Sequence, residues 1–130
     1  MVPPADRRYT RSHTWGLLDD RGEVRAGLTH VPGVFLGDVV SVELPPPGTE
    51  VASGEPIGLV ESPSTVFELV SPVTGVVVAL NPDVESVPRK VTKEPYGEGW
   101  LLTIRPSDPA ELAALLPPEE YARFAGQGEA

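Results

Sequence analysis

The stretch VESPSTVFELVSPVTGVV, residues 60–77, alternates apolar runs with turn-forming residues. Valine-rich runs of about five residues, bounded by Pro, Ser and Gly, are typical of β-strands joined by tight turns. We expect strands over 57–61, 66–70 and 75–80. The first two predict a hairpin that presents one side chain at its tip. That tip lies near Ser64, and no lysine, cysteine or histidine is close to it in the sequence.

The rest of the chain continues this pattern of short strands on both sides of the hairpin. Further strands are expected at 11–18, 23–28, 39–44 and 100–104. Thr29 is placed to cap a short helix that reaches Phe35, and Gly37 is a natural stop. One mainly β domain is therefore expected over 1–130, a sandwich or barrel with short flanking helices.

The hydrophobic period changes near the C-terminus. Asp108 and Glu111 have the spacing of a capping box, and Pro109 occupies the favoured first position of a helix. Leucines then recur at helical spacing. We expect a C-terminal helical segment over about 108–125 and a frayed tail at 126–130.

Composition and charge narrow the classes of function. The 130-residue chain has a formal net charge of −9, a pI of about 4.6 and no cysteine. The lack of cysteine excludes disulfides, thiolate nucleophiles and cysteine metal sites, and the acidity disfavours nucleic-acid binding. No run approaches the roughly 20 apolar residues of a membrane span, and the N-terminus lacks the apolar core of a signal peptide. We expect a cytoplasmic protein with no nucleic-acid or membrane partner.

Thermolabile side chains are scarce. Asn81 and Gln127 are the only side-chain amides, Met1 is the only methionine, and 16 residues are prolines. This composition favours a heat-loving source, although a GC-rich genome produces a similar bias.

No catalytic or metal-binding constellation is evident. His13 and His30 are the only histidines, and neither has metal-binding spacing; His13 is expected to be a hydrogen-bonded structural residue on a strand edge. Ser64 lacks the adjacent base and the glycine-flanked elbow of a nucleophilic serine. The carboxylates expected to be solvated are Asp19, Asp20, Glu119 and Glu120. The residues alone predict a non-catalytic binding or carrier domain without a metal site.

Several longer motifs recur in a fixed order along nearly the whole chain. They are YTRSHTW (9–15), AGLT (26–29), LGDVVSVELP (36–45), VES (60–62), Pro72-x-x-Gly75, Asn81, EPYGEGWL (94–101) and PSDPAEL (106–112). In their order and spacing these motifs resemble the H protein of the glycine cleavage system, a lipoyl carrier. The resemblance implies a flattened barrel-sandwich hybrid with short flanking helices.

The function of that family depends on one lysine at the hairpin tip, which carries lipoate through an amide bond in a Glu-Ser-Val-Lys context. Here Glu61 and Ser62 match, Pro63 replaces the usual valine, and Ser64 occupies the lysine position. The spacing from Glu61 to Gly75 is unchanged, so a shifted alignment does not restore the lysine. We therefore expect no cofactor and no cofactor-binding residue. The resemblance implies protein partners among glycine decarboxylase, aminomethyltransferase and the lipoylation enzymes.

Neighbouring positions also depart from the family pattern. Val66 and Phe67 replace small residues, which makes the tip bulkier and more apolar. Thr14 stands where the family has a glutamate that helps the cleft accept the cationic aminomethyl group. Glu68 keeps an acidic residue near the family's other acidic position. Several coordinated differences indicate natural divergence rather than one engineered substitution.

Three interpretations remain open from the sequence. The leading one is a non-lipoylated H-protein paralogue, a binding module in glycine cleavage or lipoate metabolism. The second is a working carrier with an unusual attachment site, either Lys90 or Lys93, which are the only lysines, or an ester at Ser64. The third is a structural or regulatory module in an unrelated complex.

Overall fold

The computed structural model describes residues 3–129, with side-chain positions as far as residue 126. Its strands are β1 (Arg8–Tyr9), β2 (Thr14–Leu18), β3 (Val24–Leu28), β4 (Ser41–Glu43), β5 (Glu50–Val51), β6 (Pro56–Glu61), β7 (Val66–Val70), β8 (Gly75–Leu80) and β9 (Leu102–Pro106). Its helices are α1 (Val31–Leu36), α2 (Pro82–Ser86), α3 (Lys90–Lys93), α4 (Ala110–Ala113) and α5 (Pro118–Glu129). No helix within residues 3–129 is long and apolar enough to cross a membrane.

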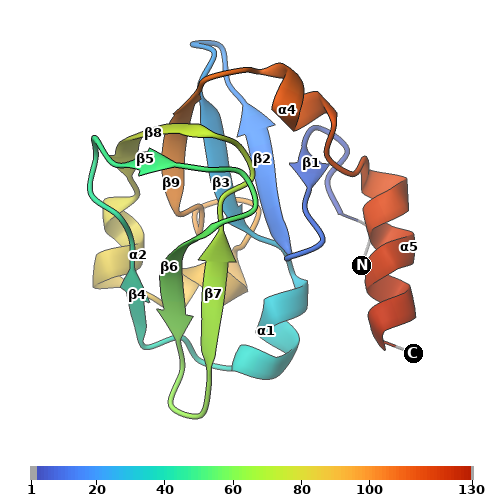
Figure 1. Ribbon diagram of the computed structural model, residues 1–130. Helices are drawn as coiled ribbons and strands as arrows, with labels where there is room; N and C mark the ends of the chain where they lie inside the picture. Colours follow the sequence, from blue (N-terminus) through green and yellow to red (C-terminus); the bar gives the residue numbers. More distant parts are fainter. Residues whose placement is uncertain (1–2, 130) are drawn as a thin grey trace.

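The strands form two antiparallel sheets with the short helices around them (Figure 1). The larger sheet has the order β1-β2-β3-β9-β8-β5, and the smaller has the order β4-β6-β7. The prediction of a mainly β fold with short flanking helices is confirmed. The two sheets do not close into a barrel; they enclose one core between them.

The predicted hairpin is formed by β6 and β7. Its antiparallel register runs from Glu61 opposite Val66 at the tip to Pro56 opposite Val70 at the base, with one irregularity near Gly58. Val60 and Leu69 are fully buried in the core. Because alternate residues of a strand point to opposite faces, the other face of the hairpin is directed outward.

The strand expected over 11–18 is shorter in the structure, and a turn precedes it. The hydroxyl oxygen of Thr10 accepts hydrogen bonds from the backbone N–H groups of Ser12 and Thr14, each at 3.2 Å. His13 adopts a left-handed conformation with φ of 66°. A threonine that bonds the backbone ahead of it competes with strand pairing, so β2 begins at Thr14.

Of the two interactions in the capping box predicted for the C-terminal segment, the one from Asp108 forms and the one from Glu111 does not. The carboxylate of Asp108 accepts from the N–H of Ala110 at 3.0 Å, as a helix-start residue does. The carboxylate of Glu111, however, accepts from the backbone N–H (2.8 Å) and the hydroxyl (3.1 Å) of Thr74. A tertiary contact has therefore replaced the local one.

The last helix, α5, continues through residues 126–129, where a frayed tail was expected, and residue 130 lies outside the described residues.

Helices α2 and α3 were not predicted. Asn81 caps α2, since its side-chain oxygen accepts from the N–H of Asp83 at 3.0 Å, and Pro82 follows at the first helical position. The same side chain donates to the carbonyls of Glu98 (2.8 Å) and Trp100 (2.7 Å). The Asn-Pro-Asp sequence was the local signal for this helix.

Two hydrophobic clusters stabilise the fold. The larger takes residues from both sheets, among them Val24, Val60, Leu69, Val77 and Ile104. The smaller joins the N-terminal strands to α5 through Tyr9, Trp15, Val31, Tyr121 and Ala125. It includes a stacked pair, the rings of Tyr9 and Tyr121, whose centroids lie 4.8 Å apart.

Replacing Gly99 with alanine is expected to lower the free energy of unfolding by about 1–3 kcal/mol. A Cβ at this position would overlap the carbonyl oxygen of Lys90 and lie 2.6 Å from that of Glu94. Urea denaturation followed by circular dichroism measures the loss. The matched control is Gly97→Ala in the same loop, where a Cβ meets nothing within 4 Å. Equal losses for the two variants would contradict this packing.

Candidate functional site

Ser64 lies on the four-residue loop that joins β6 to β7, at the end of the hairpin that projects from the fold (Figure 1). The loop is closed locally: the N–H of Ser62 donates to the carbonyl of Thr65 at 2.9 Å, and the Ser62 hydroxyl donates to the same oxygen at 3.3 Å. Ser62 is buried, whereas Ser64 is exposed. The hairpin therefore presents residue 64 to solvent on a defined turn.

The chemistry available at the tip is that of an unactivated alcohol. Among the described residues no hydrogen bond involves the Ser64 hydroxyl, and both histidines are engaged elsewhere. The Nδ1 atom of His13 lies 2.7 Å from the Tyr121 hydroxyl, and that of His30 lies 2.7 Å from the Tyr96 hydroxyl. A serine without a positioned base is a weak nucleophile. The hairpin also has no lysine, so its residues do not fit an amide-linked lipoyl group.

Two carboxylates lie on the outward face of this hairpin. Glu61 pairs with Val66, and Glu68 pairs with Leu59, so the register places all four side chains on one face. Glu68 is exposed and Glu61 is half-buried. Neither strand carries a positive charge, so the charged side chains on this face of the hairpin are all acidic.

The two lysines lie on α3, far along the chain from the hairpin. The Nζ atom of Lys90 is 3.9 Å from a carboxylate oxygen of Asp83 and 3.9 Å from one of Glu98, and its side chain is 26 % exposed. Lys93 is exposed at the end of the helix. Neither stands on a strand-connecting turn like the one that holds Ser64.

Thr14 is the first residue of β2 and lies in the interior rather than in an acidic cleft. It is fully buried, and its hydroxyl oxygen lies 2.8 Å from that of Thr10. A small hydroxyl suits this enclosed position, and no negative charge is present there. The prediction that His13 is hydrogen-bonded is confirmed, although it lies in the turn with positive φ rather than on a strand edge.

An aromatic cluster that the sequence did not predict surrounds Trp15. The guanidinium of Arg7 lies 4.5 Å from the centre of the Trp15 ring and donates to the carbonyl of Tyr96 at 3.0 Å. Burial raises the pKa of Tyr96, so its hydroxyl stays neutral and bonded to His30. Burial raises the pKa of Tyr9 as well. These groups are structural, because each is paired within the cluster.

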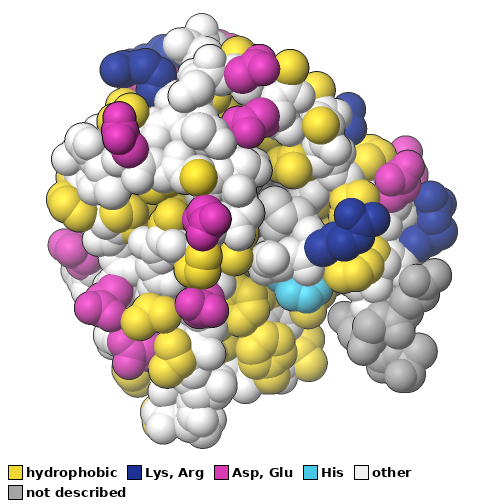
Figure 2. Space-filling view, in the orientation of Figure 1, with side chains coloured by type: hydrophobic (Ala, Val, Ile, Leu, Met, Phe, Trp, Pro, Cys, Tyr) yellow, Lys and Arg dark blue, Asp and Glu magenta, His cyan; other side chains and the backbone are white. Residues whose placement is uncertain are grey.

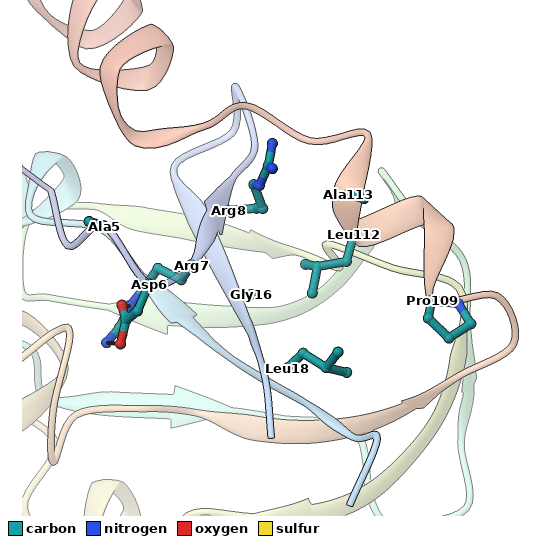
Figure 3. Close-up of a pocket in the computed structure, with 9 residues that line it drawn as sticks. All are labelled: Ala5, Asp6, Arg7, Arg8, Gly16, Leu18, Pro109, Leu112 and Ala113. Atoms are coloured by element: carbon teal, nitrogen blue, oxygen red, sulfur yellow. Dashed lines mark hydrogen bonds and ion pairs between the residues drawn. The ribbon is translucent and has the colours of Figure 1, made fainter. Parts of the chain in front are cut away.

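A pocket of about 310 Å³ lies between β1, β2 and α4 (Figure 3). Leu18 and Leu112 project into it, and its charged lining is Asp6, Arg7 and Arg8. The Arg7 Nε donates to the Asp6 carboxylate at 2.8 Å, so two of the three charges pair with each other. The one carboxylate in the lining, that of Asp6, is paired with Arg7, and Ser64 is not part of the lining.

The remaining carboxylates singled out in the sequence occupy turns and helix starts. Asp19 accepts from the N–H groups of Arg21 (2.8 Å) and Glu23 (2.9 Å), which caps the turn between β2 and β3. Asp20 is exposed beside it. Glu119 and Glu120 are exposed in the first turn of α5. In the part of the chain that the structure describes, no three His, Asp or Glu side chains gather as metal ligands do.

Comparisons with known proteins agree with the fold. A family model described as glycine cleavage H-protein matches residues 7–127. The chain is 47 % identical over 120 residues to the glycine cleavage system H protein of Rubrobacter xylanophilus, covering 92 % of each. It is 40 % identical over 121 residues to that of Bacillus velezensis, covering 93 % of this chain and 94 % of the relative. A crystal structure of a glycine cleavage system H protein from Mycobacterium marinum superposes with a TM-score of 0.83 at 38 % identity, covering 98 % of this chain and 99 % of the other.

Proposed function

The chain belongs to the glycine cleavage H-protein family, and from this premise we propose that it is a cytoplasmic binding module that carries neither lipoate nor an aminomethyl intermediate. The family consists of carrier proteins rather than catalysts. The observation that carries the proposal is Ser64, an exposed and unactivated serine at the tip of an otherwise well-formed hairpin.

The chemistry of attachment supports the proposal. The family's prosthetic group is held by an amide, which requires an amine that a serine lacks. An ester at Ser64 would need activation of the hydroxyl, and no base is hydrogen-bonded to it among the described residues. Lys90 is held between two carboxylates on α3, away from any hairpin turn.

The preserved scaffold supports a role in binding proteins. The fold extends over the same length as the relatives, and the hairpin register is intact up to its tip. We therefore propose that the protein docks on glycine decarboxylase, aminomethyltransferase or an enzyme of lipoylation. Such docking requires surface shape and charge, but no prosthetic group.

Co-expression of the chain with a lipoate ligase tests the proposal that the chain carries no lipoate. Intact-mass spectrometry is expected to find the unmodified mass alone, because the chain offers no amine at the hairpin tip. A lysine-bearing H protein in the same cells serves as the positive control. A lipoyl mass increment on this chain would contradict the proposal, and its loss in a Lys90→Arg/Lys93→Arg variant would then locate the attachment site on α3.

A further inference from the structure

Exposed apolar side chains gather at the hairpin end of the molecule. In the described part of the chain five large hydrophobic residues are exposed, and four of them lie here: Val34 (76 %), Phe35 (52 %), Val40 (57 %) and Val66 (53 %). The fifth, Leu18, is at the end of β2, beside the pocket between β2 and α4. Single exposed hydrophobic residues are common, but a concentration at one place marks a site of interaction.

Contacts of α1 and of the segment before β4 with the hairpin bring these residues to the same end of the molecule. The rings of Phe35 and Phe67 lie 5.8 Å apart, which joins α1 to the hairpin. The N–H of Val40 donates to the carbonyl of Glu61 at 2.8 Å, and Glu61 is paired with Val66 across the hairpin. We call Val34, Phe35, Val40, Val66 and the half-buried Phe67 the tip patch; Val66 lies on the outward face of the hairpin, and Phe67 lies on the opposite face beside α1.

Helix α1 has apolar side chains on its exposed side as well as on the side that packs against the core. It buries Val31, Pro32 and Leu36. Val34 and Phe35 are directed away from these residues and leave apolar surface in water. Folding therefore gains little from them, whereas burial against a partner would gain roughly 25 cal/mol per Å² of apolar surface removed from water.

The segments that carry the tip patch bear only negative charge, whereas α3, which packs against α1, carries Lys90 and Lys93. Residues 26–88 include no lysine or arginine, and their carboxylates are Asp38, Glu43, Glu50, Glu55, Glu61, Glu68, Asp83 and Glu85. Glu43, Glu61 and Glu68 share the outward face of the β4-β6-β7 sheet, since Glu43 and Glu68 both pair with Leu59. Figure 2 shows acidic side chains over these strands beside an apolar area at α1, and no basic side chain among them on this face.

We propose that the tip patch is a docking surface for a protein whose apolar contact area is bordered by lysine and arginine. This inference rests on the proposed function and specifies the surface that binds. An apolar centre with a charged rim is the usual composition of a specific protein interface. A second copy of this chain would bring carboxylates against carboxylates, and an anionic membrane would repel the same face.

Titration of the purified chain with purified glycine decarboxylase, aminomethyltransferase and lipoate ligase from the source organism tests this surface. We expect at least one to bind, and Val34→Ser/Phe35→Ser to weaken its Kd by about tenfold or more. Glu61→Gln/Glu68→Gln is expected to slow association several-fold at low salt, with dissociation nearly unchanged. Leu18→Ser removes an exposed leucine away from the patch and is the matched control. Circular dichroism verifies that each variant is folded.

A second experiment distinguishes failure of the docking surface from failure of the proposed function. A photo-cross-linking residue is placed at position 35 or, as control, at position 18, and the source cells are irradiated. Binding of the enzymes that is unaffected by the patch variants overturns the docking surface and leaves the proposed function standing. An adduct at position 35 with an unrelated protein supports the surface only if that protein, once purified, shows the same sensitivity to the variants; the link to glycine cleavage then falls. Adducts with a second copy, or no more adducts at 35 than at 18, overturn the surface.

Discussion

Replacing Ser64 with lysine is expected to make the chain a substrate for a lipoate ligase. The antiparallel register continues to the last pair before the loop, Glu61 and Val66, and Ser62 closes the loop on Thr65. Position 64 is exposed on this turn, so a lysine there would extend into solvent where a ligase can reach it. Co-expression with the ligase followed by intact-mass spectrometry is expected to show one lipoyl increment on the variant and none on the natural chain.

Two further variants separate the position of the amine from its charge. Ser64→Arg places a long cation at the tip without an amine that a ligase can acylate, and it should stay unmodified. Thr65→Lys moves the amine by one residue and should be modified far less. If Ser64→Lys is not modified, Pro63 or the bulky Phe67 has altered the shape that the ligase reads, and the loss of carrier function extends beyond one residue.

Replacing Trp15 with alanine is expected to cost about 3–5 kcal/mol of unfolding free energy. The side chain is 1 % exposed, and its Nε1–H lies 2.9 Å from the carbonyl oxygens of both Leu28 and Pro95. The Arg7 guanidinium covers its ring at 4.5 Å. Alanine would leave a cavity, and the carbonyls of Leu28 (buried) and Pro95 (partly buried) would lose this donor. Urea denaturation followed by far-ultraviolet circular dichroism measures the loss.

Trp15→Phe is the matched control for the Trp15→Ala prediction. Phenylalanine keeps most of the buried volume but has no N–H, so its cost should be about 1–3 kcal/mol and smaller than that of alanine. Trp100, which is half-buried under Arg25, should tolerate alanine better than Trp15 does. Equal costs at the two tryptophans would show that the smaller cluster is not organised around Trp15.

The second strand of the hairpin and the strand that follows it could be predicted, because turn-forming residues in the local sequence mark their limits. The strands β7 and β8 coincide with the expected ranges, since Pro63 and Ser64 precede the first apolar run and Ser71 and Pro72 separate it from the second. The capping box failed for the opposite reason. The Glu111 carboxylate accepts a hydrogen bond from Thr74. The local spacing of residues does not predict a contact between positions so far apart in the sequence.

The candidate site also has one part that the sequence predicted and one part that it did not. Ser64 at the tip followed from a fixed spacing, and the structure places it on the exposed turn. The tip patch did not follow, because Val34 and Phe35 have the composition of an inward-facing helix turn. Only the packing of α1 through Val31, Pro32 and Leu36 determines that these two side chains are directed outward.

The loop from Ser62 to Thr65 is closed by its own backbone and by the Ser62 hydroxyl, and the side chain of residue 64 takes no part in that closure. Exchanging this side chain therefore leaves the stability of the fold nearly unchanged, because an exposed position without such contacts contributes little to it. Natural selection for a stable protein consequently does not distinguish serine from lysine at this position. Selection acts there only through the function of the hairpin tip. The identity of residue 64 therefore reflects that function and not the stability of the fold.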